Sequence, residues 1–350
     1  MLTETFIFAL LWLAILYYFV YHWGKTDRPQ KADVETMIPL FTGRPVMWIF
    51  VYPTTNSRNW ADFGSRKMDA VNLPWVNLCV SSIVNQNPEY NIHIVTPTNL
   101  SLYLPEITFT PSDIQHQEEL RDWIKWSLLA KYGGTWITPT CVCLESMYDI
   151  TLLTESCEMA VIGCDSSTAV CLGDDDRVNT DVIAVRPKSA IAARIADAIG
   201  AFYNNKLASG YEFRQSEQYI VTQEIRKNRD SIMILPGGLD GTRTATGRPV
   251  SIENLLSQNE VAFPEKCRMV LMPDDILRRD IWGWFNRMSE KQVLMSDMCI
   301  SRLLRESLPH DVVMMIVEDD GDEWPVTAAS DILGKNVFNT QPQLITFSKA

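Results

Sequence analysis

Apolar residues follow two alternating patterns between residues 45 and 305. Short apolar runs predict strands at 46–52, 92–97, 135–138, 141–144, 159–163, 181–187, 231–236 and 269–272. Apolar residues three and four positions apart predict helices at 72–86, 119–132, 191–203, 217–227 and 290–305. Asn87-Pro88 and Gly133-Gly134 are expected to end the first two helices, because neither pair favours a continuing helix.

Strands that alternate with helices predict an α/β domain with a mostly parallel, Rossmann-like sheet flanked by helices on both faces. We place this domain at residues 44–310 and expect 311–350, with its acidic run at 318–323, to be an exposed C-terminal flank. Ligands of such sheets bind outside the carboxyl ends of the strands. Residues 52–56, residues 96–99 and the turn after Trp136 are therefore expected to border the functional site.

The first apolar segment carries no charge from Phe6 to Trp23. As a helix it would span roughly 27 Å, about the thickness of a bilayer core. Its last turns are rich in aromatic side chains, which prefer the headgroup layer: Tyr17, Tyr18, Tyr21 and Trp23. A cleaved signal peptide would need a basic start and small residues at a cleavage site. The sequence therefore predicts a single-pass membrane anchor at 1–24, followed by a polar linker at 25–43.

The side of the membrane that holds the body is predicted by charge. Lys25, Arg28 and Lys31 follow the apolar segment, and no basic side chain precedes it. The positive-inside tendency places the body on the cytosolic side. The opposite orientation stays open.

The net charge argues against a nucleic-acid-binding protein, and the spacing of Cys and His argues against a zinc site. The formal net charge of −12 argues against a nucleic-acid partner, which would require a basic surface. The chain has no CxxC and its four histidines are scattered, so a zinc site is not expected. Cys141 and Cys143 lie two apart and are expected to be core packing.

Three stretches in the first half of the body resemble a known family. They contain Trp48–Tyr52 with residues 75–90, then Ile92–Asn99, and then Leu128–Trp136. In this order they are similar to glycosyltransferases that carry a DXD motif, in particular the capsular polysaccharide synthesis family, over about residues 45–200. Residues 60–66, 238–242 and 278–289 resemble an offshoot of that family found in large DNA viruses.

The resemblance implies a GT-A-like nucleotide-sugar transferase fold, a nucleotide-sugar donor and a glycan or lipid-linked acceptor. In the family, an acidic pair after the Tyr-Gly-Gly turn holds Mn²⁺ or Mg²⁺ on the donor diphosphate. Here those positions fall on Thr138 and Thr140. Hydroxyls are poor replacements for carboxylates as ligands of these cations. No metal ligand is therefore assigned, and the need for a divalent metal is doubtful.

Individual residues can be given candidate roles, Asp122, Lys125, Thr138 and Thr140 from the resemblance and the others from their place in the sequence. Asp122 and Lys125 match the family's Asp-x-x-Arg and would contact ribose or phosphate, unless they are an ordinary exposed helical pair. Thr138 and Thr140 would bind a sugar or simply continue the strand. Asp181 is a candidate catalytic group that would accept the proton of an acceptor hydroxyl. Asp174–Asp176 could supply a displaced metal site, although acidic runs in loops are usually solvated.

An aromatic patch with arginines is the last candidate. Arg278, Arg279 and Arg287 surround Trp282, Trp284 and Phe285. Such a group can bind sugars or phosphates, face a protein partner or pack in the core, and core packing is favoured. Lys125, Arg278 or Arg279 could stabilise a donor diphosphate without a metal.

Two functions are left open by the sequence. The chain is a membrane-anchored transferase, or it is an inactive transferase fold kept as a membrane-linked structural or interaction protein, such as one of a virion.

Overall fold

The computed structural model describes residues 43–51, 73–107, 117–163, 178–209, 217–277 and 279–318. All of them belong to one compact unit, Gly43–Ala350. The predicted anchor and nearly all of the predicted linker lie outside the described residues, as do 52–56, 60–66 and 174–176. Within the described ranges, no helix has the length and apolar character needed to span a bilayer.

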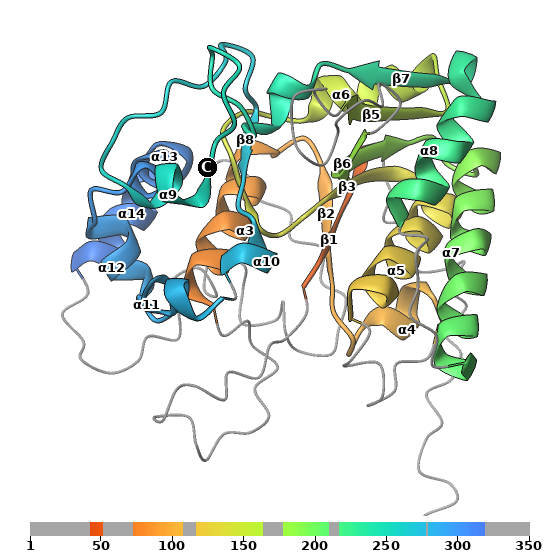
Figure 1. Cartoon of the computed structure of the whole chain (residues 1–350), viewed down its shortest axis with the longest axis horizontal. Coiled ribbons are helices and arrows are strands. Elements are labelled where there is room, and N and C mark those ends of the chain that lie inside the picture. The colour runs from red at the N-terminus through yellow and green to blue at the C-terminus, as the bar shows by residue number, and fades with distance from the viewer. Residues whose placement is uncertain are drawn as a thin grey trace, which may run out of the picture. The chain divides into compact units, whose positions relative to one another are not determined.

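Six strands of the described chain form one sheet in the order β2-β1-β3-β6-β5-β7 (Figure 1). They are β1 (Val46–Phe50), β2 (Asn91–Val95), β3 (Gly134–Ile137), β5 (Met159–Gly163), β6 (Val178–Val185) and β7 (Ile232–Leu235). β1 is parallel to β2 and β3, and β5 is parallel to β7. β6 is antiparallel to both β3 and β5. The predicted mostly parallel sheet is confirmed, with one reversed strand.

The reversal of β6 places its first residues beside the carboxyl end of β3. Ile137, the last residue of β3, pairs with Val182. The next residue, Thr138, donates its backbone N–H to the carbonyl of Asp181 at 2.9 Å. β6 also begins at Val178, earlier than predicted, and this extension adds residues 179 and 180 to the same edge of the sheet.

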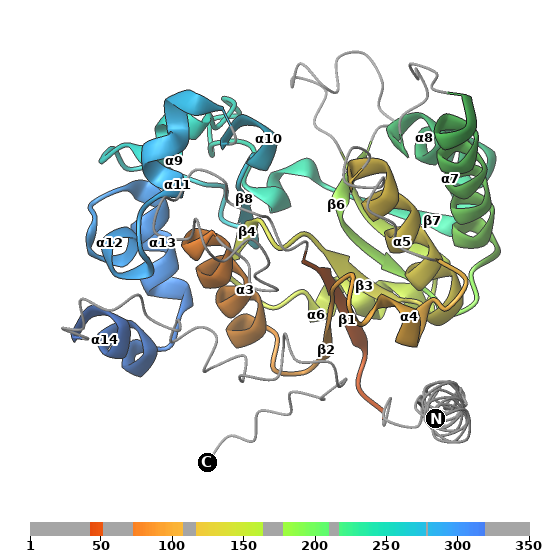
Figure 2. The ribbon, with the colours of Figure 1, turned by 90° about the horizontal axis from the view of Figure 1, so that it is seen from below.

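Helices flank both faces of the sheet (Figure 2). One side carries α5 (Gln117–Tyr132), α7 (Ala190–Ser209) and α8 (Glu217–Lys227), and the other carries α3 (Pro74–Gln86). The predicted ends of the first two helices are confirmed. After α3, the buried Asn87 accepts the backbone N–H of Met147 and donates to the carbonyl of Ile83, both at 2.8 Å.

Two predicted strands leave the main sheet and form a second, small one. β4 (Cys141–Cys143) pairs antiparallel with β8 (Met269–Leu271). Cys141 and Cys143 are fully buried in the hydrophobic core together with residues of α3. The prediction that these cysteines pack in the core is confirmed.

The remaining helices are shorter, and most of them follow β7. They are α4 (Leu100–Tyr103), α6 (Tyr148–Leu152), α9 (Ile252–Leu256), α10 (Asp274–Leu277), α11 (Gly283–Asn286), α12 (Glu290–Met295), α13 (Cys299–Ser307) and α14 (His310–Glu318). Short 3₁₀ turns are η4 (Leu153–Glu155), η5 (Arg229–Ser231), η6 (Gly237–Asp240) and η7 (Asp280–Trp282).

The predicted single helix at 290–305 is wrong, because the chain forms α12 and α13 with a break between them. Ser296 and Met298 have extended backbone, with ψ of 159° and 150°. The Ser296 hydroxyl lies 2.9 Å from the carbonyl of Val293 and 2.7 Å from the hydroxyl of Ser301. A serine that bonds to the backbone of the preceding turn competes with the continuing helix.

α14 begins at His310, where the sequence places the end of the domain. Its residues Val312, Val313 and Ile316 are buried in the hydrophobic core. The packed body therefore continues to Glu318, and 319–350 lies outside the described residues.

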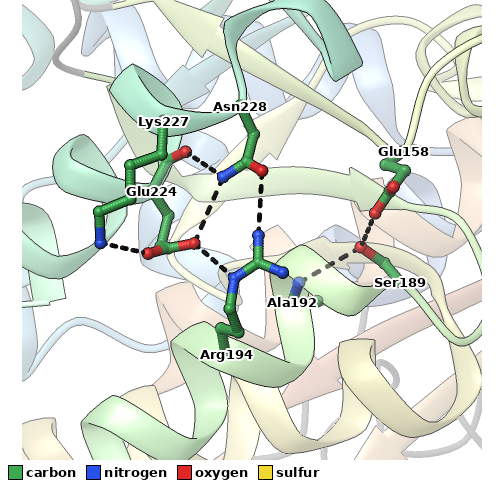
Figure 3. Close-up of polar contacts among 7 residues, drawn as sticks. All are labelled: Glu158, Ser189, Ala192, Arg194, Glu224, Lys227 and Asn228. Atoms are coloured by element: carbon green, nitrogen blue, oxygen red, sulfur yellow. Dashed lines mark hydrogen bonds and ion pairs between the residues drawn. The ribbon is translucent and has the colours of Figure 1, made fainter.

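Glu224 ties α7 to α8 (Figure 3). Its carboxylate accepts hydrogen bonds from Arg194 Nε and Lys227 Nζ, both at 2.8 Å. Arg194 also donates to Asn228 Oδ1 at 3.0 Å. Burial alone would raise the pKa of Glu224, but the hydrogen bonds and charges of Lys227 and Arg194 hold it below its ordinary value. This cluster fixes α8, whose first residue reaches the candidate site described below.

Gly134, in the turn from α5 into β3, cannot accept a side chain without strain. Its φ is +95°, and a Cβ there would lie 2.5 Å from the carbonyl oxygen of Val46. We expect Gly134→Ala to lower the free energy of unfolding by about 3 kcal/mol, since left-handed strain is added to a backbone clash. Thermal unfolding should show Tm lower by roughly 6–12 °C.

Gly247→Ala is the matched control for this substitution. Gly247 has φ +80°, but a Cβ there meets nothing within 4 Å. It carries the strain without the clash, so its loss of Tm should be clearly smaller. An equal loss in both variants would contradict the role given to the Val46 carbonyl.

Candidate functional site

The two threonines singled out by the sequence lie together at the carboxyl edge of the sheet. Thr138 and Thr140 follow β3, and their hydroxyl oxygens are 3.2 Å apart. The backbone N–H of Met272, just after β8, donates to the carbonyl of Thr140 at 2.8 Å. The turn that carries both hydroxyls is thus held between the main sheet and the small one.

Asp181 lies on β6 beside this turn. Its carbonyl accepts the N–H of Thr138, and its own N–H donates to Asn179 Oδ1 at 2.8 Å. The side chain is partly exposed, and no described residue donates a hydrogen bond to its carboxylate. A carboxylate with a fixed backbone and an open side chain can accept a proton or a hydrogen bond from a ligand.

Asp240, at the end of η6, is linked to Asp181 through Asn179. It is 4% exposed and accepts hydrogen bonds from Asn179 Nδ2 at 2.8 Å and from the N–H and hydroxyl of Thr242 at 3.0 and 2.6 Å. Burial raises the pKa of Asp240, and the nearby charge of Asp181 adds to this rise. Asp240 thus orients Asn179, which in turn orients Asp181.

Lys125 forms a second, buried cluster next to Asp181. Its Nζ lies 2.6 Å from Glu217 Oε1, 3.2 Å from the carbonyl of Thr180 and 3.5 Å from Asp122 Oδ1. Thr180 also donates its hydroxyl to Glu217 Oε2 at 2.9 Å. Lys125 is 2% exposed. Its ammonium group therefore holds the residue that precedes Asp181 and is engaged by protein atoms on all sides.

Glu217 is a residue of this cluster that sequence reasoning missed. It is the first residue of α8, and it also accepts the indole N–H of Trp126 at 2.5 Å. Burial raises the pKa of Glu217 to about 7, the charge of Asp122 adds to the rise, and Lys125 opposes it. Two carboxyl groups thus share one buried lysine.

This cluster makes stability depend on pH. The ordinary pKa of a glutamate is 4.5, so between pH 4.5 and about 7 the folded protein holds a proton on Glu217 that the unfolded chain releases. The contribution of Glu217 to the free energy of unfolding is therefore largest below pH 4.5 and is lost as pH rises toward about 7. Denaturant unfolding across this range should show this slope in the wild type and a weaker slope in Glu217→Gln.

Glu260→Gln, at an exposed position, is the control and should keep the wild-type slope. If Glu217→Gln also kept the full slope, the pH dependence would have to come from other groups.

The donors at this edge do not fit a divalent cation. Among the residues that the structure describes, the oxygen groups here are the hydroxyls of Thr138 and Thr140 and the open carboxylate of Asp181, because Asp240 is bonded to Asn179 and Thr242. Mn²⁺ and Mg²⁺ favour several hard oxygen ligands that include carboxylates. Over the described parts of the chain, no group of three or more His, Cys, Asp or Glu could hold a metal ion. The acidic run at 174–176 lies outside these parts.

The aromatic patch is divided between core and surface. Phe285 is fully buried, with its ring 5.8 Å from that of Trp75, and Trp282 packs partly buried against the core. Trp284 is 43% exposed. The favoured packing interpretation is confirmed for Phe285 and Trp282 and is wrong for Trp284, and Phe285 is not available to a protein partner.

A family match covers the part of the chain that carries the main residues of the candidate site. Residues 72–209 match the sequence family described as capsular polysaccharide synthesis protein. This part runs from α3 to the end of α7 and contains Thr138, Thr140, Asp181 and Lys125. The resemblance inferred from the sequence is confirmed over this part. No curated protein matches the chain at a significant level.

Solved glycosyltransferase structures resemble the chain at low identity. The PaToxG glycosyltransferase is 11% identical with a TM-score of 0.31, over 52% of this chain and 68% of that chain. The apo form of the glycosyltransferase GlyE from Streptococcus pneumoniae TIGR4 is 10% identical with a TM-score of 0.37, over 75% of this chain and 62% of that chain. A second structure of GlyE gives 10% identity and a TM-score of 0.36 with the same coverage.

Proposed function

We propose that the chain is a membrane-anchored glycosyltransferase with a GT-A-like fold, which transfers a sugar from a nucleotide-sugar donor to a glycan or lipid-linked acceptor. The observation that carries this proposal is the grouping of Thr138, Thr140 and the open carboxylate of Asp181 at the carboxyl edge of the sheet. This edge is where open α/β sheets bind ligands. The anchor is the apolar segment at 6–23, and its flanking charges favour a cytosolic body.

Asp181 is the base of the proposed reaction. An acceptor hydroxyl attacks the anomeric carbon of the donor sugar, and the bond from that carbon to the diphosphate oxygen breaks. The electron pair leaves with the diphosphate, and the hydroxyl proton passes to the Asp181 carboxylate. A positioned base of this kind contributes about 10²- to 10⁴-fold to a rate. Asn179 and Asp240 hold the carboxylate in place for this step.

The donor is bound by side chains without a metal bridge. Thr138 and Thr140 take the place of the acidic pair, and their hydroxyls donate hydrogen bonds to the nucleotide-sugar. Lys125 is engaged by Glu217 and acts as a positioning residue for β6. Arg278 lies outside the described residues, whereas Arg279 is exposed and follows α10, the helix that comes after β8 in the chain. We assign the leaving diphosphate to Arg279 and the ribose to Asp122.

One observation favours a second function. Lys125 is buried and paired with Glu217, and the described oxygen groups at the site do not fit a divalent cation. Both features are also expected of a transferase fold that no longer catalyses a reaction. Such a chain would serve as a membrane-linked interaction protein.

Release of nucleoside diphosphate separates the two functions. The full-length chain in detergent is incubated with a panel of UDP- and GDP-sugars and a panel of oligosaccharide and lipid-linked acceptors, with and without Mn²⁺, and free UDP or GDP is quantified against a heat-inactivated sample. Release from at least one donor is the result that the transferase proposal predicts. A folded chain that releases nothing from any donor would leave the interaction protein.

A further inference from the structure

A surface pocket of about 580 Å³ lies where α11 meets α12. Its lining comprises one exposed indole, one guanidinium, one amide, one hydroxyl-bearing side chain and two thioethers: Trp284, Arg287, Gln292, Ser296, Met288 and Met295. Pockets that hold small ligands have volumes of roughly 300–1,000 Å³ and combine apolar walls with a few polar groups. This pocket has such a volume and such a lining, and it is widely open to solvent, so it would cover one face of a bound ligand.

The walls of the pocket are fixed by packing against the core and by the cap at the start of α12. The ring of Trp284 packs edge-on against Phe285 at 5.9 Å, and Phe285 packs against Trp75 at 5.8 Å, so the indole rests on the core. The start of α12 is fixed by a capping box in which Gln292 Oε1 accepts the N–H of Ser289 at 2.9 Å. A rigid wall loses little conformational freedom when a ligand binds.

The pocket lies toward the same edge of the sheet as Asp181. Because α3 connects the parallel strands β1 and β2, it begins at their carboxyl edge. Its first turns are bonded to both sides of the pocket segment, with Trp75 Nε1 donating to Asn286 Oδ1 at 3.0 Å and Asn77 Nδ2 donating to Glu290 Oε1 at 3.2 Å. Figures 1 and 2 both show α11 and α12 beside α3.

The chemistry of the lining fits a saccharide. A sugar ring presents C–H groups on its faces and hydroxyls around its edge, which match an exposed indole flanked by a guanidinium and an amide. A lipid surface would call for several cations, whereas Arg287 is the one cation among the lining residues. A protein interface needs a contact area far larger than a single pocket of this size.

We propose that this pocket binds the saccharide chain of the acceptor, with Trp284 as the stacking platform and with Arg287 and Gln292 as donors to ring hydroxyls. This inference rests on the proposed transferase function and extends it. It assigns the acceptor to the glycan class, because the pocket offers a sugar ring a platform outside the reaction centre.

Calorimetry without nucleotide tests the pocket independently of the reaction. The full-length chain in detergent is titrated with linear oligosaccharides of glucose, galactose, mannose, rhamnose and N-acetylglucosamine. At least one should bind saturably, and Trp284→Ala should weaken its binding about tenfold or more. Trp284→Phe keeps an aromatic ring on Phe285 and should retain most of the affinity, which guards against loss of fold as the cause.

Two controls localise the effect. Tyr219→Ala removes an aromatic side chain that is 50% exposed on α8, and it should leave saccharide binding unchanged. Leu152→Ala removes an apolar side chain that is 41% exposed on α6, and it should also leave saccharide binding unchanged.

Saccharide binding that is equal in the wild type and Trp284→Ala would overturn the proposal. So would a folded chain that binds a nucleotide-sugar but none of the oligosaccharides, although the transferase function would then stand. Self-association that depends on Trp284, without any saccharide binding, would also overturn the proposal and would make the pocket a contact between copies of the chain.

Discussion

Asp181→Asn is expected to lower sugar transfer by about 10²- to 10⁴-fold, because the amide keeps the shape of the side chain and cannot take a proton. The backbone of Asp181 is held by Thr138 and Asn179, so the fold should not change. The measurement is the rate of nucleoside diphosphate release with the most active donor and acceptor, together with Tm.

Asp197→Asn is the matched control for this substitution. Asp197 is an exposed carboxylate on α7, and its loss should leave the rate unchanged. If Asp181→Asn kept the wild-type rate, Asp181 would not be the base and the proton would have to go elsewhere.

Lys125→Met is expected to lower the free energy of unfolding by about 3 kcal/mol at pH 7, because it leaves the buried carboxyl group of Glu217 without its cation. Glu217 lies 2.6 Å from Lys125 Nζ, whereas Asp122, 3.5 Å from Nζ, keeps an ion pair with Arg121 at 3.6 Å. Glu217 can take up a proton in response, since burial already raises its pKa to about 7. The loss should therefore be smaller at pH 5 than at pH 7.

The double variant Lys125→Met/Glu217→Gln separates the ion pair from ordinary packing. Removing both charges should recover part of the stability lost in Lys125→Met, because replacing a whole buried pair costs less than breaking it. Denaturant unfolding of the wild type, both single variants and the double variant gives the coupling free energy. Additive losses would show that Lys125 and Glu217 do not act as a pair.

The elements of the fold could be predicted from local patterns where burial is strong. β1 and β5 are fully buried, so their uninterrupted apolar runs have the form of strands in a covered sheet. The stops at Asn87-Pro88 and Gly133-Gly134 were also predictable, because they depend on backbone chemistry that is local to a few residues.

Features set by distant partners could not be predicted in this way. The direction of β6 depends on its neighbours β3 and β5, and no apolar period encodes strand direction. Glu217 meets Lys125 only after α5 and α8 pack, so no spacing in the sequence indicates the pair.

The candidate site was predicted in part. Thr138, Thr140 and Asp181 come from separate segments of the sequence, and the structure places them at one edge of the sheet. Asp240 lies in the stretch 238–242 that resembles the viral offshoot, but no role was predicted for it, and its bonds to Asn179 and Thr242 follow from the fold. Phe285 and Trp284 are neighbours with opposite exposure, which a short aromatic run without a clear period does not distinguish.

Calorimetric titration of the full-length chain with UDP- and GDP-sugars, in Mn²⁺ and then in EDTA, tests the central claim most directly. We predict saturable binding of at least one donor that persists in EDTA and that weakens about tenfold in Arg279→Ala. A folded chain that binds no donor, with or without Mn²⁺, would contradict the transferase account and leave a membrane-linked interaction protein.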